Sequence, residues 1–288
     1  MSKLRFVGVS LVLLAIGIGF GSLMQGAWGL RWGGPLAGVD VEVSRDREAR
    51  SVAQNGDEFE WEGALRPGDV LEVKGVNGSI RARAADGRQA RVEAEKRARR
   101  SDPNEVRIEV VEHANGVTIC AIYPSRDGEN RCEAGDGGRN SVRNNDVKVE
   151  FTVYVPAGVD FTARTVNGEV DAEGLEGHAD VSTVNGDVEV ETSAGASART
   201  VNGSIFARLG STWDQDLEIE TVNGSIEVDV PDDAGAEVDA SWVNGSLEIE
   251  PPLSLHGRMS RRSAEGVLGA GGAELELKTV NGSIRVHE

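Results

Sequence analysis

The sequence predicts an all-β protein built as a parallel β-solenoid, in which short strands stack coil upon coil. Three observations lead to this prediction. A motif of Val-Asn-Gly, a polar residue and an apolar residue occurs seven times. Apolar and polar residues alternate on both sides of each motif, as they do in half-buried strands. The 288 residues include 37 Gly but only 3 Met, which is typical of many short strands separated by turns.

The Asn-Gly steps of the seven motifs mark the predicted bends between strands. They are Asn77-Gly78, Asn167-Gly168, Asn185-Gly186, Asn202-Gly203, Asn223-Gly224, Asn244-Gly245 and Asn281-Gly282. From the second to the sixth step the spacings are 18, 17, 21 and 21 residues, which suits one coil of a stacked repeat. The parity of the apolar positions changes at each step, as between Ile219 and Ile226. Two inward-facing strands therefore meet at every Asn-Gly bend.

Two architectures fit this pattern. In stacked hairpins, Thr221 would pair with Ile226 across the bend, and Glu220 would then face Glu227 on the outside. In a solenoid each strand pairs with its counterpart in the next coil, and the stacked asparagines can form a hydrogen-bonded ladder. The solenoid's first outward column reads Arg164, Ser182, Arg199, Glu220, Ser241 and Lys278, without like neighbours. Its second column still places Glu227 beside Glu248. We favour the solenoid and retain hairpins as the alternative.

The repeats are flanked by sections that we expect to cap the exposed strand edges. Longer strands are predicted at 92–96, 106–111, 117–123 and 147–155. Near the other end, the stretch 251–272 begins with Pro251-Pro252 and is rich in Gly, so we expect a loop there. The predicted organisation is a signal or anchor at 1–30, a linker at 31–59 and one repeat domain at 60–288. That domain divides into an opening section, 60–155, and regular repeats with a C-terminal cap, 156–288.

The N-terminus has the composition of an export signal. Lys3 and Arg5 precede an uncharged run from Phe6 to Met24. This run is longer than a cleaved signal core needs and approaches the length of a membrane-spanning helix. Cleavage after Gly29 and retention as an anchor both remain open. In either case the two cations are expected to stay in the cytoplasm, with the rest of the chain outside it.

Charge and cysteine content restrict the function. The net charge is −18, which argues against nucleic acid as a partner because an acidic body repels phosphates. Cys120 and Cys132 are the only cysteines. In an oxidising compartment they are expected to form a disulfide that contributes about 3 kcal/mol by closing a short loop.

No residue pattern indicates catalysis or a cofactor. Asp171, Glu189, Glu227 and Glu248 recur at equivalent outward positions, and we interpret them as the solvated side of alternating strands. The histidines, His113, His178, His256 and His287, lack the spacing of metal ligands. Trp242 has inward parity and is expected in the core. Trp213 lies in a predicted loop, where it could stack on a sugar ring or pack beneath the loop.

The Thr-Val-Asn-Gly-Ser-Ile units resemble those of the bacterial β-strand-repeat adhesin-like family, a domain family of unknown function related to the head-GIN auto-transporter adhesins. The stretches 66–73 and 155–159 and the Gly-rich run before the last repeat share this resemblance, which covers roughly residues 60–288. It implies an extracytoplasmic β-solenoid with links to the cell envelope and no established catalytic activity. It supplies no functional residues.

The sequence thus predicts a non-catalytic extracytoplasmic scaffold or adhesin-like binding module of the bacterial envelope. Its expected partners are an envelope polymer or a surface protein, with the membrane contacted through the N-terminus; no cofactor or metal is expected. Three alternatives stay open. They are a carbohydrate-active β-helix enzyme, a self-assembling bactofilin-like scaffold and an envelope-stress sensor. The enzyme would need three or more acids and a basic group in one groove.

Overall fold

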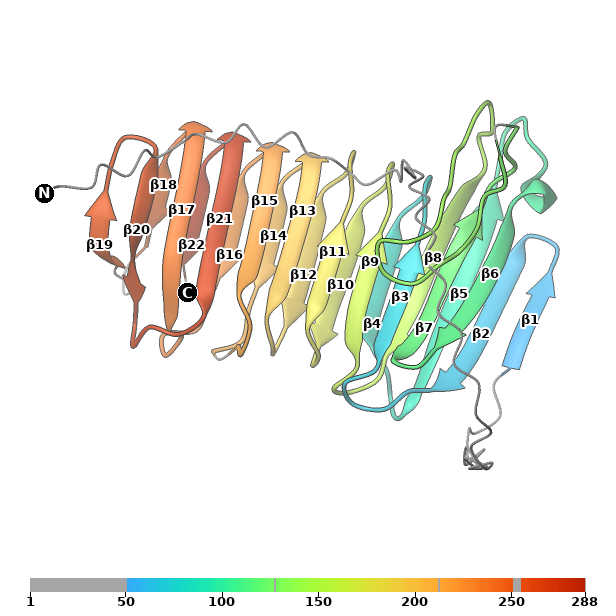
Figure 1. The fold of residues 1–288 in the computed structure, drawn as a ribbon, viewed down its shortest axis with the longest axis horizontal. Helices are drawn as coiled ribbons and strands as arrows, with labels where there is room; N and C mark the ends of the chain where they lie inside the picture. Colours follow the sequence, from blue (N-terminus) through green and yellow to red (C-terminus); the bar gives the residue numbers. More distant parts are fainter. Residues whose placement is uncertain (1–50, 127, 212, 251–254, 288) are drawn as a thin grey trace, which may run out of the picture.

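The computed structural model describes residues 51–126, 128–211, 213–250 and 255–287. Within them, two eleven-stranded β-sheets and one 3-10 turn, Pro103–Glu105, make up the regular structure (Figure 1). The all-β prediction is confirmed. The expected export segment lies outside the described residues. The first strand begins at Ser51, inside the range that the sequence assigns to a linker.

The two sheets lie face to face along the length of the molecule. Sheet A contains, in spatial order, β1 (Ser51–Asn55), β2 (Glu58–Ala64), β5 (Gln89–Arg97), β8 (Lys148–Val155), β4 (Ile80–Ala84), β10 (Val170–Leu175), β12 (Val188–Thr192), β14 (Ile205–Arg208), β16 (Ile226–Asp229), β22 (Ile284–His287) and β18 (Leu247–Ile249). Sheet B contains β19 (Leu255–Met259), β20 (Ser263–Leu268), β17 (Ala236–Asn244), β21 (Glu274–Asn281), β15 (Leu217–Asn223), β13 (Ala196–Asn202), β11 (Ala179–Ser182), β9 (Asp160–Arg164), β3 (Val70–Lys74), β7 (Gly116–Ile122) and β6 (Arg107–His113).

Each Asn-Gly step joins a strand of sheet B to a strand of sheet A, and we call such a pair of strands a coil. Ile226 pairs in parallel with Ile205 of one neighbouring coil and with Ile284 of the other, whereas Thr221 pairs with Thr200 and Thr279. The two strands of a coil therefore do not form a hairpin, and the hairpin alternative is wrong. Alternate residues of both sheets point inward and fill one core.

The spatial order of the coils differs from their order in the sequence. The last coil, β21–β22, lies between β15–β16 and β17–β18 (Figure 1). The predicted outward column is correct from Arg164 to Glu220 and wrong in its last two members, because Lys278 pairs with Glu220 on one side and Ser241 on the other. The second outward column, on sheet A, shows a physical reason for this order, because it contains two glutamates that would otherwise be neighbours.

Arg285 separates the two acids that the sequence places side by side. Its guanidinium lies 3.4 Å from the Glu227 carboxylate and 3.6 Å from the Glu248 carboxylate. Directly opposed acids destabilise a sheet, so the inserted coil replaces an unfavourable contact with two favourable ones.

At the N-terminal end of the solenoid a coil is likewise inserted out of sequence order. Coil β3–β4 lies between coil β9–β10 and the strands β7 and β8, which come later in the chain than β4. Antiparallel strands then extend both sheets, β6 beyond β7 and β5, β2 and β1 beyond β8. The four strands expected in this opening section are observed as β5 to β8.

The stretch 251–272 contains two strands where the sequence predicts a loop. β19 and β20 form an antiparallel hairpin, and β20 pairs with β17 from Ala236 to Ser241. The loop prediction is wrong because it rests on the local sequence pattern alone, which is weak in this stretch. The outer edge of β17 offers free backbone donors and acceptors, and pairing with β20 satisfies them.

The asparagines of the seven repeats form one continuous ladder along the corner of the solenoid. From the second asparagine of the ladder onward, each side-chain amide donates to the side-chain oxygen of the preceding asparagine at 2.8–2.9 Å. The order along the ladder is Asn77, Asn167, Asn185, Asn202, Asn223, Asn281 and Asn244. The ladder explains why every bend carries Asn.

Close stacking at the same corner explains the Gly and Thr of each motif. A Cβ on Gly203 would lie 1.9 Å from the carbonyl oxygen of Gly186 in the adjacent coil, so no other residue fits. The hydroxyl of Thr200 donates to that same oxygen at 2.9 Å. In the coil β17–β18, Trp242 takes the place of Thr and is buried, as its inward parity predicts.

Candidate binding site

A shallow hollow lies at the corner opposite the asparagine ladder, where loops lead from sheet A back to sheet B. Its volume is about 820 Å³. Four successive loops contribute, at 156–159, 176–178, 193–195 and 209–216. The residues that line it are Gly158, Asp160, Glu176, Gly177, His178, Ala194, Gly195, Trp213, Asp214 and Gln215.

Differences in loop length create the hollow. The loops 176–178 and 193–195 are tight turns, and the hydroxyl of Thr192 ties them together by donating to the Gly177 carbonyl at 2.7 Å. The longer loop 209–216 folds back over its shorter neighbour. A Cβ on Gly195 would lie 2.7 Å from Leu217 and 3.1 Å from the Cβ of Trp213, so glycine at this position lets Trp213 approach the core.

Two residues that line the hollow each have a buried ring nitrogen without a hydrogen-bond partner among the described residues. Trp213 is half-buried and packs against the core, and both Trp213 Nε1 and His178 Nδ1 are buried without a hydrogen bond within the described residues. An unpaired buried donor costs about 1–3 kcal/mol.

Three carboxyl groups also line the hollow, from Asp160, Glu176 and Asp214. Asp160 is partly committed to structure, because its Oδ1 accepts from the backbone N–H of His178 at 3.0 Å. The hollow thus contains the acids that an enzyme would need, but its lining includes His178 as the basic group and neither Lys nor Arg. The sequence singled out Trp213 alone. The one signal for the others was the contrast between one long loop and its short neighbours.

The four histidines are not brought together. His113 Nε2 lies 3.3 Å from the Thr118 hydroxyl, and His287 Nε2 lies 3.0 Å from the Glu227 carboxylate at the other end of the molecule. Across the residues described, no group of three His, Cys, Asp or Glu side chains is arranged to hold a metal ion.

The recurring acids on the outer face of sheet A do not form a continuous stripe. Asp171 pairs with Glu189, and Phe206 then separates Glu189 from Glu227. Arg83 donates to both carboxylate oxygens of Asp171, at 3.0 and 2.8 Å. A cation and an aromatic ring therefore interrupt the row of acids.

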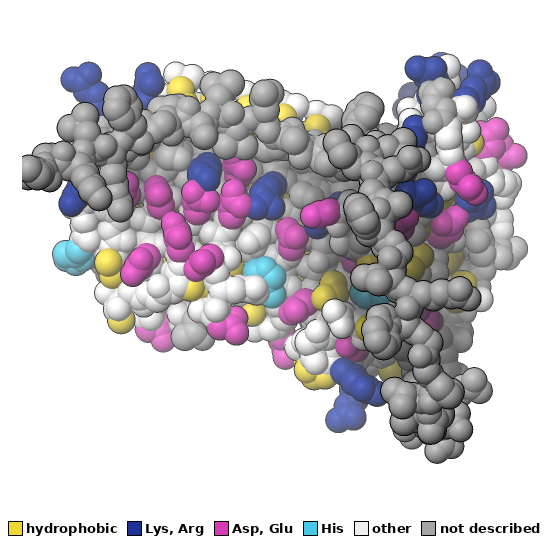
Figure 2. All heavy atoms as spheres, viewed as in Figure 1, with side chains coloured by type: hydrophobic (Ala, Val, Ile, Leu, Met, Phe, Trp, Pro, Cys, Tyr) yellow, Lys and Arg dark blue, Asp and Glu magenta, His cyan; other side chains and the backbone are white. Residues whose placement is uncertain are grey.

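The outer face of sheet B carries a denser acidic patch, which spans its C-terminal half (Figure 2). Within it, Glu218, Glu276, Asp239 and Glu265 are directly paired across four adjacent strands. Lys278 lies 2.5 Å from the Glu276 carboxylate and neutralises part of this row. Burial, together with Glu265 and Glu276, raises the pKa of Asp239. Burial and Glu218 likewise raise the pKa of Glu220.

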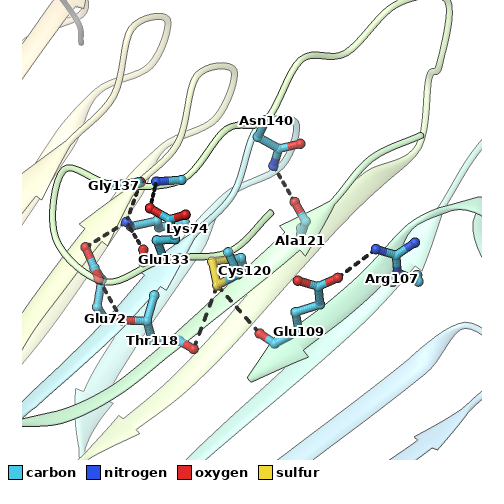
Figure 3. Close-up of a disulfide and its surroundings, with 12 residues drawn as sticks. Glu72, Lys74, Arg107, Glu109, Thr118, Cys120, Ala121, Glu133, Gly137 and Asn140 are labelled. Carbon is cyan, nitrogen blue, oxygen red and sulfur yellow. Dashed lines mark hydrogen bonds and ion pairs between the residues drawn. A yellow bond between two sulfur atoms is a disulfide. The ribbon is translucent and has the colours of Figure 1, made fainter. Parts of the chain in front are cut away.

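A disulfide joins Cys120 in β7 to Cys132 and fixes the long loop between β7 and β8 (Figure 3). This loop lies over the outer face of sheet B. The ammonium group of Lys74 donates to the carbonyl oxygens of Glu133 at 2.7 Å and Gly135, and burial lowers the pKa of Lys74.

Glu72, beside Lys74, anchors the same loop. It is only 3% exposed, because the loop covers it, and its carboxylate accepts from the Thr118 hydroxyl at 2.8 Å and the Gly135 N–H at 2.9 Å. The disulfide loop is therefore part of the packed structure and not a free surface segment.

No helix in the described part of the chain is long and apolar enough to cross a membrane, and the apolar run 6–24 falls outside that part. No curated protein matches the chain.

Several solved structures are similar to it. A "putative cell adhesion protein" from Clostridium sporogenes is 11% identical, with 80% of this chain and 99% of that chain covered and a TM-score of 0.39. A "putative adhesin" from Bacteroides fragilis is 12% identical, with 81% and 98% covered and a TM-score of 0.26. A third, a "putative adhesin" from Parabacteroides distasonis, is 13% identical, with 81% and 98% covered and a TM-score of 0.24.

A family profile also matches this chain. The profile of the Toastrack DUF4097 family matches residues 141–287, which extend from the end of the disulfide loop through all the coils from β9–β10 to the last strand. This match confirms the resemblance to a bacterial β-strand-repeat domain family of unknown function. The chain belongs to the Toastrack DUF4097 family.

Proposed function

We propose that this protein is an exported, non-catalytic binding module of the bacterial cell envelope, in which a β-solenoid presents one loop corner to an envelope glycan. The hollow at Trp213 carries the proposal. It combines the half-buried indole of Trp213 with the polar side chains of Glu176, Asp214 and Gln215 in one open depression. An indole face can pack against the C–H face of a sugar ring, while the ring's hydroxyls hydrogen-bond to these carboxylate and amide groups.

Rigidity of the corner favours binding. The loops that form the hollow are held by backbone contacts between adjacent coils, such as the bond from Ala179 N–H to the Gly195 carbonyl at 3.1 Å. A preformed site loses little conformational entropy when a ligand binds. A solenoid therefore suits a scaffold that displays its binding groups in fixed positions.

Two features of the chain support export. The uncharged run 6–24 after Lys3 and Arg5 has the composition of a signal or anchor, which would also attach the protein to the membrane. The Cys120–Cys132 disulfide suits an oxidising compartment.

The proposal of a binding module rather than a glycosidase rests on how the acids are used. Asp160 accepts from a backbone N–H, and neither Lys nor Arg lines the hollow. Acid–base chemistry on a glycan needs groups that are free to exchange protons with the substrate.

The test measures binding of the full-length protein to insoluble peptidoglycan by co-sedimentation, with release of reducing ends recorded in parallel. We expect saturable binding without release of reducing ends. Trp213→Ala should weaken binding about tenfold, the equivalent of the ~1.4 kcal/mol that aromatic stacking supplies. Phe206→Ala is the matched control, because Phe206 is an aromatic residue on the outer face of sheet A, away from the hollow.

Trp213 also packs on the core, so Trp213→Phe serves as a second variant that keeps the packing but removes Nε1. It should bind more weakly than the wild type with unchanged unfolding. Equal binding by all variants would disprove the role of the hollow. Turnover that disappears in Asp160→Asn or Glu176→Gln would instead establish the enzyme alternative.

A further inference from the structure

The asparagine ladder consists of chemically labile steps. In an Asn-Gly sequence the backbone nitrogen of glycine can attack the side-chain carbonyl carbon of asparagine, because glycine has no Cβ to hinder the approach. The new C–N bond closes a succinimide, the nitrogen loses its proton, and the side-chain nitrogen leaves as ammonia. Water then opens the ring to aspartate or to isoaspartate. The seven repeats contain seven such steps.

The fold protects six of these steps in the same way. The glycine N–H, which must become the nucleophile, donates to the backbone carbonyl of the asparagine in an adjacent coil. These bonds join Gly78 to Asn167, Gly168 to Asn185, Gly186 to Asn202, Gly203 to Asn223, Gly224 to Asn281 and Gly282 to Asn244, at 2.9–3.1 Å. All six glycines are buried or half-buried. Attack therefore requires local opening of the corner.

The seventh step, Asn244-Gly245, lies at the end of the ladder and lacks this protection. Within the described part of the chain the Gly245 N–H has no acceptor. Gly245 is also the one glycine of the seven that is exposed. The side chain of Asn244 makes a single ladder bond, to Asn281 at 2.8 Å, whereas an interior asparagine makes two.

The other end of the ladder is different. Gly78 is buried, its N–H is bonded to the Asn167 carbonyl at 2.9 Å, and a Cβ there would lie 2.1 Å from the carbonyl oxygen of Val149. Strand β8 of the opening section thus covers the bend at Asn77. Among the described residues, only the C-terminal end of the ladder combines a glycine N–H without an acceptor and an asparagine side chain with one ladder bond.

We propose that, among the seven asparagines of the ladder, Asn244 is the one that deamidates selectively and spontaneously in the folded protein. Conversion to aspartate removes the amide donor to Asn281 and adds a negative charge at the end of the ladder. Conversion to isoaspartate routes the main chain through the former side chain, which lengthens it by one atom between β17 and β18. Either product weakens the contact of β18 with β22, so the modification loosens the C-terminal coil as the protein ages outside the cell.

The experiment incubates the folded full-length protein at mildly alkaline pH and follows each Asn-Gly step by peptide mapping and mass spectrometry. We expect Asn244 to react about tenfold or more faster than Asn185 and Asn202, because the interior steps must first open two further hydrogen bonds, each worth about fivefold. In concentrated urea the seven steps should react at similar rates, which would assign the selectivity to the fold.

Asn244→Gln should abolish the fast phase in the folded state, whereas Asn202→Gln, the matched interior control, should leave it in place. Hydrogen exchange of the aged protein should increase in β18 before it increases in β12 or β14. If Asn202 or Asn77 reacts in the folded protein as fast as Asn244, the proposal is wrong. It is equally wrong if Asn244 resists deamidation in the folded state but reacts in urea.

Discussion

The two ends of the solenoid share one threading scheme but are closed differently. At each end a coil is inserted out of sequence order, β3–β4 at one and β21–β22 at the other. The N-terminal end adds antiparallel strands to both sheets and a disulfide-fixed loop across sheet B. The C-terminal end adds a hairpin to sheet B alone, so sheet A stops at β18, a strand of three residues.

This difference shows at which end of the solenoid the described backbone groups are left without neighbours. The N-terminal cap covers the last bend, as Val149 does at Gly78. At the C-terminal end the bend at Gly245 and the outer edge of β18 have no described neighbour, and the acidic row on sheet B lies next to them. We therefore expect the N-terminal end to be the more stable of the two and the C-terminal end to open first.

The largest predicted effect is that of replacing the buried tryptophans, because each end of the solenoid contains one. Trp61 in β2 is fully buried, and Trp242 in β17 is 7% exposed. Trp61→Ala should reduce the free energy of unfolding by about 4 kcal/mol and Trp242→Ala by about 3 kcal/mol, measured by urea denaturation.

Trp61→Phe is the matched control. It should cost less than about 1.5 kcal/mol, because Trp61 Nε1 has no hydrogen-bond partner among the described residues. A larger loss at Trp242 than at Trp61 would reverse the proposed order of the two ends.

Removal of the disulfide tests the N-terminal closure alone. The double variant Cys120→Ser, Cys132→Ser should lose about 3 kcal/mol, because the unfolded chain regains the freedom of the loop. Hydrogen exchange should increase at β7 and in the loop that follows it, and stay unchanged in β17. Equal increases at both ends would mean that the disulfide stabilises the whole solenoid and not one closure.

A smaller effect is expected at the acidic row of the C-terminal end. Asp239 faces Glu265 and Glu276 on the adjacent strands, and no ion pair to it is formed among the described residues. Asp239→Asn should raise the free energy of unfolding by up to about 1 kcal/mol, because it removes two like-charge contacts. Asp86, an exposed acid in the bend between β4 and β5, is a suitable control. A decrease on thermal or urea denaturation would show that Asp239 has a favourable partner.

The smallest predicted effect is on stability as a function of pH, which should change in opposite directions at the two ends. At the C-terminal end, burial raises the pKa of Asp239 and of Glu220 in the folded state. Folding is therefore penalised above these pKa values, and the penalty is relieved as the pH falls through them.

At the N-terminal end the pH dependence of stability has the opposite sign. Hydrogen bonds from Ser101 lower the pKa of Asp146 to about 2, and Arg164 lowers the pKa of Asp136. Their contribution is present above the unfolded value near 3.8 and is lost as the pH falls toward 2. Hydrogen exchange at pH 7, 5 and 3 should thus show β17 becoming more protected first and the loop at 133–139 becoming less protected last. Parallel changes at both ends would contradict this assignment.

Much of the fold could be predicted from local patterns. The alternation around each Asn-Gly step determines which side chains face inward, and the structure buries Leu217, Ile219, Ile226 and Val228 accordingly. The binding corner was less accessible to prediction. Trp213 stood out as an aromatic residue in a loop, but its proximity to His178 and Asp160 depends on how three short loops stack beside a long one.

The sequence by itself determined the secondary structure, the phase of each strand and the bend at each repeat, because these depend on neighbouring residues in one coil. Only the tertiary structure decided the order of the coils. Every coil has nearly the same inward pattern and the same backbone pairing, so these contributions barely distinguish one neighbour from another. Long-range charge contacts differ between the alternatives, and Arg285 between Glu227 and Glu248 is available only when the last coil is inserted before β17–β18.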